Sequence, residues 1–158
     1  MALVLGLDIG TTSTIGILID TDGQTLAVAD APVELFSLRP GWAEQDPLQW
    51  WRNSCTVTAA LLRQSGAKTR QIAAVGVTGM LPAVVLLDSS DNLLRRSIQQ
   101  SDGRTGREVE ELASEVDPAV FVQRTGNGIN QQLVAAKLRW LERHEPEVFA
   151  RIGTVFGS

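Results

Sequence analysis

Several residue types with familiar chemical roles are scarce in this 158-residue sequence. The single cysteine, Cys55, excludes an internal disulfide and a metal site built from clustered cysteines. One histidine, His144, beside acidic residues, leaves little for a histidine-based zinc site. The only lysines, Lys68 and Lys137, do not belong to a Gly-x-x-x-x-Gly-Lys-Ser/Thr sequence. A Walker-type phosphate loop is therefore excluded.

Charge and hydrophobic runs exclude further classes. The formal net charge of −4 gives no electrostatic basis for binding nucleic acid or an anionic membrane. No apolar run approaches the ~20 residues of a membrane span, and no basic region precedes the apolar residues 3–7, so no signal peptide is visible. We expect a cytoplasmic protein with no nucleic-acid and no membrane partner. The length suits one domain with a sizeable core.

Residues 3–33 predict three consecutive strands joined by short polar turns. Apolar, β-branched runs at 3–7 and 15–19 flank the first turn, and residues 20–23 (Asp-Thr-Asp-Gly) lead into a third run at 25–33. Runs this short, bounded by Gly and Asp, are typical of strands rather than helices.

The first turn carries Asp8, Gly10, Thr11, Thr12 and Ser13. Gly10 leaves room for another group near the backbone, and successive N–H groups in such a turn can form an anion-binding concavity. The three hydroxyls add donors for phosphate oxygens. Asp8, at a strand end, is suited to Mg²⁺, which takes one or two carboxylates plus substrate phosphates. The alternative is an ordinary hairpin in which these residues serve geometry alone.

A helix is predicted to begin at Asp46 (N-cap) and Pro47 (N1) and to end near Ser65-Gly66. Its expected buried stripe, with Cys55 as a small hydrophobe, is Leu48, Trp51, Cys55, Thr58, Leu61 and Leu62. The apolar run 72–77 predicts a strand buried on both faces.

The remainder predicts strands at 83–87 and 93–98, helices at 105–116, from 118 to about 126, at 131–144 and from 146, and a last strand at 152–156. A final strand with nothing to cover its neighbour indicates a fragment.

Taken in order, six segments resemble the N-terminal part of the FGGY family of carbohydrate kinases, and within it the xylulose kinase-like members. Together they span essentially the whole chain, residues 1–158. The segments are Leu7-Asp8-Ile9-Gly10-Thr11-Thr12-Ser13, Trp42-Ala43-Glu44-Gln45-Asp46-Pro47, Val75-Gly76-Val77-Thr78-Gly79, Leu86-Leu87-Asp88, Ser101-Asp102-Gly103-Arg104 and Arg143-His144-Glu145-Pro146-Glu147.

The resemblance implies an α/β, ribonuclease-H-like (actin/hexokinase-type ATPase) domain with a mixed sheet and helices on both faces. It implies transfer of the γ-phosphoryl group of ATP, with Mg²⁺, to a sugar or polyol, most naturally a xylulose-like pentulose; a homodimer is compatible with it. By this resemblance Asp8 lies near the metal, and Gly10, Thr11, Thr12 and Ser13 form the first phosphate loop. The general-base Asp is expected in a Gly-Gly-x-Asp segment outside this chain, so no catalytic residue is expected here and the 158 residues alone are expected to be inactive.

The resemblance places the acceptor at Met80, Leu81, Pro82, Ser101 and Asp102. Xylulose kinases typically carry Gln-Met-His where this sequence has Met80-Leu81-Pro82, so the histidine donor is replaced by a residue without a side-chain donor. An aromatic residue of the family is likewise replaced in Gln100-Ser101. Because an unpaired buried polar group costs about 1–3 kcal/mol, these exchanges bear on which sugar is accepted.

Other interpretations of the same residues remain open. Asp102 could be the N-cap of the following helix, and Trp42 could flank a ligand. Trp51 and Trp140 are expected in the core, and His144 at a helix C-terminus. A solvated helix face is expected from Glu108, Glu110, Glu111 and Glu115.

Two other functions fit the same expected fold. One is a non-catalytic sugar-binding or regulatory module. The other is a nuclease with Asp8 as a metal ligand, which the scarcity of further carboxylates at neighbouring strand ends disfavours.

Overall fold

The computed structural model describes residues 2–157, which form two compact units. The first unit comprises residues up to 35 together with 46–80, and the second comprises 36–45 together with the residues from 81 onward. The first unit contains β1 (Leu3–Ile9), β2 (Ser13–Asp20), β3 (Thr25–Pro32), α1 (Pro47–Ser65), a 3₁₀ turn (Thr69–Gln71) and β5 (Ile72–Gly79). The second contains β4 (Glu44–Gln45), β6 (Val85–Leu87), β7 (Ser97–Ile98), α2 (Gly106–Glu115), α3 (Pro118–Thr125), α4 (Val134–His144), α5 (Pro146–Phe149) and β8 (Thr154–Phe156). Among residues 2–157, no helix is long and apolar enough to span a membrane.

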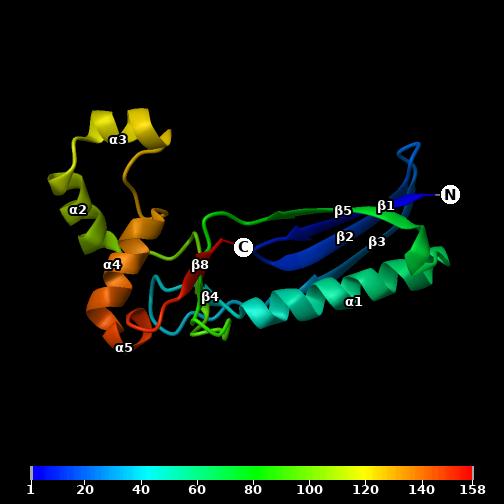
Figure 1. The fold of residues 1–158 in the computed structure, drawn as a ribbon, viewed down its shortest axis with the longest axis horizontal. Helices are drawn as coiled ribbons and strands as arrows, with labels where there is room; N and C mark the ends of the chain where they lie inside the picture. The colour runs from blue at the N-terminus through cyan, green and yellow to red at the C-terminus, as the bar shows by residue number, and fades with distance from the viewer. Residues whose placement is uncertain (1, 158) are drawn as a thin grey trace. The chain divides into compact units, whose positions relative to one another are not determined.

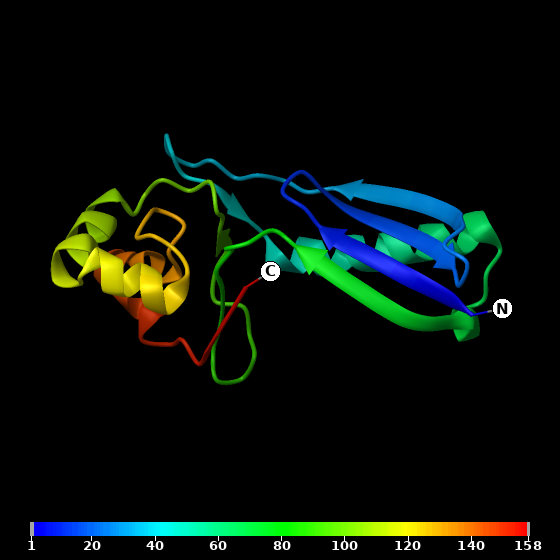
Figure 2. The same ribbon diagram turned by 90° about the horizontal axis from the view of Figure 1, so that it is seen from above.

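The first unit is a four-stranded mixed sheet with α1 on one face (Figures 1 and 2). The strand order is β3-β2-β1-β5; the first three strands form an antiparallel meander, and β5 runs parallel to β1. Val57 and Leu61 of α1 pack on the apolar side chains of β1 to β3. A Cβ at Gly16 would lie 2.4 Å from Val57 Cγ1, so this glycine lets α1 approach β2. The predicted mixed α/β class and the three opening strands are confirmed. Helices were expected on both faces of the sheet, but among residues 2–157 α1 is the one α-helix of the first unit, and it covers one face.

The start of α1 confirms the predicted N-cap, whereas the buried face of the helix differs from the predicted one. Asp46 Oδ1 accepts the Leu48 N–H at 2.9 Å, and Gly66 ends the helix at φ 69°. Leu61 is buried as predicted, but the other buried residues of the helix are Trp50, Ser54 and Val57. Trp51 is 71% exposed and Cys55 is exposed, so the predictions that both are buried are wrong. The two stripes differ by one residue, about 100° around the helix, and both carry apolar side chains.

The prediction that the run 72–77 is buried on both faces is also wrong. β5 is an edge strand in residues 2–157, and Val75 and Val77 are 56% and 68% exposed. Helix α1 packs on β1, β2 and β3 and leaves these side chains uncovered. A continuous apolar run indicates a strand but does not say which elements cover it.

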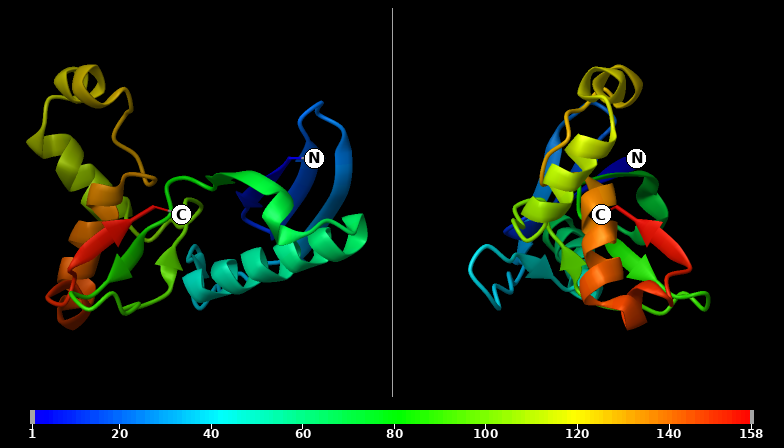
Figure 3. Two further views of the ribbon diagram at one scale, coloured as in Figure 1. Left: turned by 45° about the vertical axis from the view of Figure 1, so that its right-hand side comes forward. Right: turned by 90° about the vertical axis from the view of Figure 1, so that its left-hand side faces the viewer.

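The second unit packs short strands against α4. Its core consists of Val84, Leu86, Ile98, Trp140 and Leu141. β8 pairs antiparallel with β6, which confirms the final strand (Figure 3), and β4 pairs antiparallel with β7. The expected strand at 93–98 is reduced to the two residues of β7, and the helix expected from 131 begins at Val134.

Helices α2 and α4 are joined by ion pairs, which corrects the expected solvated face of α2. Glu108 is 1% exposed and accepts from Arg143 at 3.3 Å. Arg143 also pairs with Glu111 at 2.6 Å, and Arg139 pairs with Glu115 at 2.8 Å. Glu108, Glu111 and Glu115 therefore hold a neighbouring helix, whereas Glu110 is exposed as predicted.

Candidate functional site

In the first unit, Asp8 lies near the C-terminal end of β1, on the sheet face opposite α1. In the ladders it stands directly across from Ile15 of β2 and Thr78 of β5, so the three side chains share one face. Asp8 is exposed and borders a shallow hollow with an apolar floor formed by Ile15 and Ile17. The carboxylate is thus available to a ligand from outside the unit.

The turn after β1 is tight and fixed by its own backbone. The Gly10 N–H donates to the Ser13 carbonyl at 3.0 Å, and a Cβ at Gly10 would lie 2.8 Å from that oxygen. The Val33 N–H donates to the Thr12 carbonyl at 2.9 Å, which ties the turn to the end of β3. A glycine is required at position 10 because any side chain would collide with the turn.

The structure therefore brings Asp8, Gly10, Thr11, Thr12 and Ser13 together at one end of the sheet. Thr78, at the end of the parallel strand β5, joins them. Sequence reasoning did not assign Thr78 to the site; the signal was its place at the end of a strand parallel to β1. Met80 belongs to the same unit, where its N–H donates to the Ile9 carbonyl at 3.0 Å and its side chain is buried.

Asp8 is not part of a cluster of potential metal ligands among the described residues. Among residues 2–157 no three His, Cys, Asp or Glu side chains gather in a way that could hold a metal ion. A metal held by protein ligands alone does not fit this site. A Mg²⁺ ion that keeps its waters and takes its other ligands from phosphate oxygens does fit, because it needs only one or two carboxylates.

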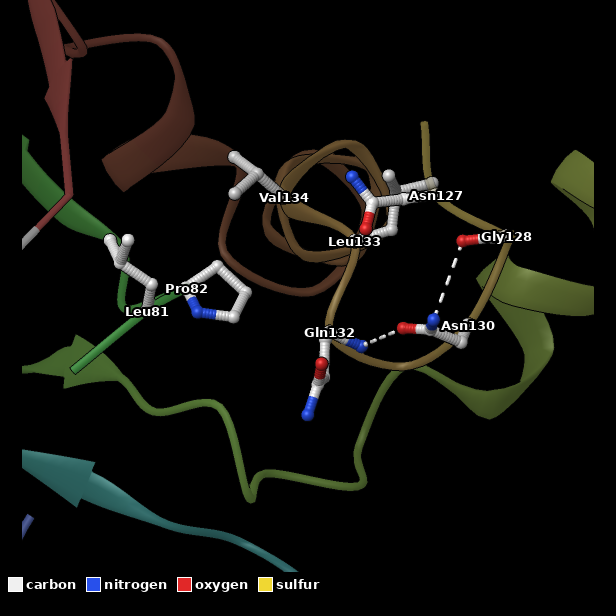
Figure 4. Close-up of a pocket in the computed structure, with 8 residues that line it drawn as sticks. All are labelled: Leu81, Pro82, Asn127, Gly128, Asn130, Gln132, Leu133 and Val134. Atoms are coloured by element: carbon white, nitrogen blue, oxygen red, sulfur yellow. Dashed lines mark hydrogen bonds between the residues drawn. The ribbon is translucent and has the colours of Figure 1, made fainter. Parts of the chain in front are cut away.

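A pocket of about 490 Å³ lies in the second unit (Figure 4). Leu81 and Pro82 line one side. Gln132, Leu133 and Val134 at the beginning of α4 line another. The remaining lining residues come from the loop before α4: Asn127, Gly128 and Asn130. The volume falls in the range of about 300–1,000 Å³ that small-molecule sites occupy.

The loop on the far side of this pocket is held by its own amides. Asn130 Nδ2 donates to the Gly128 carbonyl at 3.3 Å, and Asn130 Oδ1 accepts the Gln132 N–H at 2.8 Å. The side chains of Asn127 and Gln132 are exposed in the pocket lining (Figure 4). Sequence reasoning missed these amides, although the polar run between Gly126 and Val134 was a signal for a ligand-facing loop.

Ser101 and Asp102 are neighbours in the sequence, but the first is exposed and the second is buried. Ser101 is exposed and lines a second hollow with Gln100 and Gln131. Asp102 is 1% exposed, and its carboxylate accepts the Ala43 N–H at 2.6 Å and two guanidinium N–H groups of Arg104 at 2.7 and 2.8 Å. The N-cap of α2 is Thr105, so the interpretation of Asp102 as that cap is wrong.

Arg104 lies between two acidic groups and two tryptophan rings. Its guanidinium also donates to Glu44 at 2.8 Å, and Glu44 pairs in turn with Arg95. It stacks over the Trp42 ring at 3.8 Å and the Trp140 ring at 4.8 Å. Burial alone would lower the pKa of Arg104, but the hydrogen bonds to Asp102 and Glu44 outweigh it and raise the pKa.

Two further expectations concern the aromatic residues here. Trp42 packs edge-on against Trp140, with ring centroids 5.4 Å apart, and is half-buried, so it forms part of this cluster. Trp140 is buried in the core and His144 ends α4, as the sequence predicted.

Comparison with known proteins gives a consistent result. Residues 3–158 match the FGGY family of carbohydrate kinases, N-terminal domain. The chain is 33% identical over 153 residues to the xylulose kinase of Escherichia coli (97% of this chain, 31% of that protein). It is 37% identical over 149 residues to the glycerol kinase of Dechloromonas aromatica (94% and 30%).

Among solved structures, the xylulose kinase from Rhodospirillum rubrum superposes with a TM-score of 0.94 at 57% identity, covering 99% of this chain and 32% of that one. The chain thus spans about a third of the length of the relatives that it matches. The match over residues 3–158 shows that this chain belongs to the FGGY family of carbohydrate kinases and corresponds to its N-terminal domain.

Proposed function

We propose that this chain is the acceptor-binding lobe of an ATP-dependent kinase that phosphorylates a hydroxyl of an uncharged sugar or polyol. The observation that carries the proposal is the group at the end of β1: one exposed carboxylate, a glycine-fixed turn and three adjacent hydroxyl residues. The chain spans about a third of the length of its relatives, and in this proposal the general base and the rest of the nucleotide site lie outside it.

In this proposal Asp8 holds Mg²⁺, directly or through water, and the turn of Gly10, Thr11, Thr12 and Ser13 binds phosphate oxygens. Bound Mg²⁺ supplies charge neutralisation for the transferring phosphoryl group. Transfers of this kind depend mainly on positioning and on electrostatic stabilisation, which a rigid turn at a strand end provides. The hydrogen bonds of Gly10 and Thr12 within the first unit keep this turn in one conformation.

The acceptor is proposed to bind in the pocket beside Leu81 and Pro82, with Ser101 at the neighbouring hollow. The side chains of Asn127 and Gln132 offer both donors and acceptors, which suit hydroxyl groups. The pocket lining contains no charged side chain, so it offers no partner for the carboxylate of a sugar acid. A pentulose or a smaller polyol such as glycerol fits this chemistry better than an aldonate.

Asp102 has a different proposed role from the one that the resemblance implied. Its carboxylate is buried and binds Ala43 and Arg104, so we place it behind the acceptor site, where it fixes the segment that carries Ser101.

The test measures phosphorylation by the full-length kinase that carries this domain, with the release of ADP as the readout. D-xylulose, L-xylulose, D-ribulose, glycerol and gluconate are the acceptors. The proposal predicts turnover with at least one neutral acceptor and none with gluconate. Turnover confined to gluconate contradicts the acceptor class, and ATP-independent sugar binding without any turnover identifies a non-catalytic module.

A further inference from the structure

Lys137 is a buried ammonium group that the proposed reaction does not use. It lies in the middle of α4, and the residue is 0% exposed. Its Nζ donates to the Pro82 carbonyl at 2.9 Å and to the Gln99 carbonyl at 2.9 Å. Burying a charged amine is costly unless its donors are satisfied, so such a residue is seldom incidental.

The two carbonyls belong to the two segments on which the acceptor site was placed. Pro82 lines the pocket itself. The Gln99 carbonyl also accepts the Asp102 N–H at 3.2 Å, in the turn that carries Ser101. One ammonium group therefore joins the two segments, although they are 17 residues apart in the sequence.

Helix α4, which carries Lys137, also forms the opposite side of the pocket. Leu133 and Val134 line the pocket one turn before it, on the same face of α4. The ammonium thus fixes the distance between the beginning of α4 and the Leu81–Pro82 segment. If that contact is lost, the pocket walls can separate while the core of Trp140 and Leu141 stays in place.

The charged groups around Lys137 are consistent with a protonated amine. Burial is the main cause that lowers the pKa of Lys137, the Asp102 carboxylate raises it and the Arg104 guanidinium lowers it, and the net pKa is about 8. Asp102 is itself neutralised by Arg104. The principal partners of the ammonium are therefore the two carbonyls and not an acidic side chain.

We propose that Lys137 is a positioning residue of the acceptor site, which holds the Leu81–Pro82 segment and the Gln99–Asp102 turn at a fixed separation through its two carbonyl contacts. The inference rests on the proposed function only in locating the acceptor at this pocket. It assigns Lys137 no contact with the substrate and no role at the phosphates.

The test compares Lys137→Met with Lys68→Met in the full-length kinase. Lys68 is the matched control because it is the other lysine of this chain and is exposed. With D-xylulose and glycerol as acceptors, Lys137→Met should raise the acceptor KM about tenfold or more, since small misplacements of a binding wall have effects of that size. The KM for ATP should stay within about twofold of wild type in both variants.

Amide hydrogen exchange gives a readout that does not require activity. In Lys137→Met, peptides covering residues 81–84 and 99–103 should exchange faster, whereas those of β1 and β2 should not. Lys137→Gln, which keeps an N–H donor, should recover part of both the KM and the protection. It also serves as the second variant if Lys137→Met does not fold.

Unchanged exchange at 81–84 and 99–103, or equal increases in the KM values of acceptor and ATP, would overturn the inference. If the wild-type kinase phosphorylates none of the acceptors, the proposed function fails. The exchange data then still decide whether Lys137 holds the two segments. The two failures are therefore distinguishable.

Discussion

The buried ammonium of Lys137 makes the stability of the domain depend on pH, in the direction opposite to that of a lysine whose pKa is raised by an ion pair. The residue is fully buried, and its pKa falls from the ordinary 10.5 to about 8. Between these two values the unfolded chain binds a proton that the folded chain has released. Stability therefore rises with pH across this window.

The size of the effect follows from the same pKa change. At about 1.36 kcal/mol per pH unit, the change from 10.5 to about 8 corresponds to about 3 kcal/mol. Below pH 8 the folded state bears this whole cost, because the amine is charged in both states. Above pH 10.5 the cost has disappeared, because the amine is neutral in both.

The assay is urea denaturation of the 158-residue chain at pH 7, 8, 9 and 10, for wild type and Lys137→Met. Subtracting the two curves removes the contributions of all other groups. The wild type should gain about 2 kcal/mol relative to Lys137→Met between pH 8 and pH 10. If the free energy of unfolding changes with pH in the same way in the two proteins, the buried charge at position 137 is refuted. A ¹³Cε-lysine NMR resonance that is assigned to Lys137 by its loss in Lys137→Met and titrates near pH 10.5 would refute it as well.

Three further predictions concern the rest of the chain. In the full-length kinase, Asp8→Asn should lower kcat by about 100-fold or more and leave the acceptor KM unchanged, because a metal-bound carboxylate acts on the transition state. Asp22→Asn, in the exposed turn before β3, is the control, and equal kcat values would remove Asp8 from the metal site. In urea denaturation of the 158-residue chain, Trp50→Ala should cost about 3–5 kcal/mol of folding stability because Trp50 is buried. Trp51 is 71% exposed, so Trp51→Ala should cost less than about 0.5 kcal/mol. Similar losses in the two variants would contradict the orientation of α1. Asp46→Ala should cost about 1 kcal/mol by the same assay, since its carboxylate caps α1, and no loss would exclude that cap.

Local chemistry made the boundaries of several elements predictable. The Asp46-Pro47 pair could be identified as a helix start from the sequence because a cap is a contact between neighbours, and the structure contains that contact. The turn around Gly10 was predictable for the same reason. Its role in binding phosphate is not a local property and stays a prediction.

Burial was less predictable, because it depends on elements far apart in the sequence. Both the stripe containing Trp50 and the stripe containing Trp51 carry enough apolar side chains to form the buried face of α1, and only packing on β1 to β3 selects the first. The exposure of Val77 likewise follows from its edge strand. An apolar pattern does not contain this information.

The pocket could not be predicted from the sequence, although the position of Lys137 in the sequence was one signal for it. Lys137 falls three residues after Val134 and four before Leu141, on the apolar face of a predicted helix. A lysine at such a position needs buried acceptors, but the sequence does not name them. The Pro82 and Gln99 carbonyls are backbone atoms, for which residue identity carries no signal.

The central claim is that the turn after β1 holds nucleotide phosphates beside an Asp8-bound magnesium ion. A crystal structure of the full-length kinase with Mg²⁺, a non-hydrolysable ATP analogue and D-xylulose or glycerol tests it directly. The account predicts a magnesium ion whose ligand, at about 2.1 Å, is either an Asp8 oxygen or a water bonded to it, with phosphate oxygens at the Thr11–Ser13 turn. A nucleotide bound elsewhere, with this turn packed against protein, would contradict it.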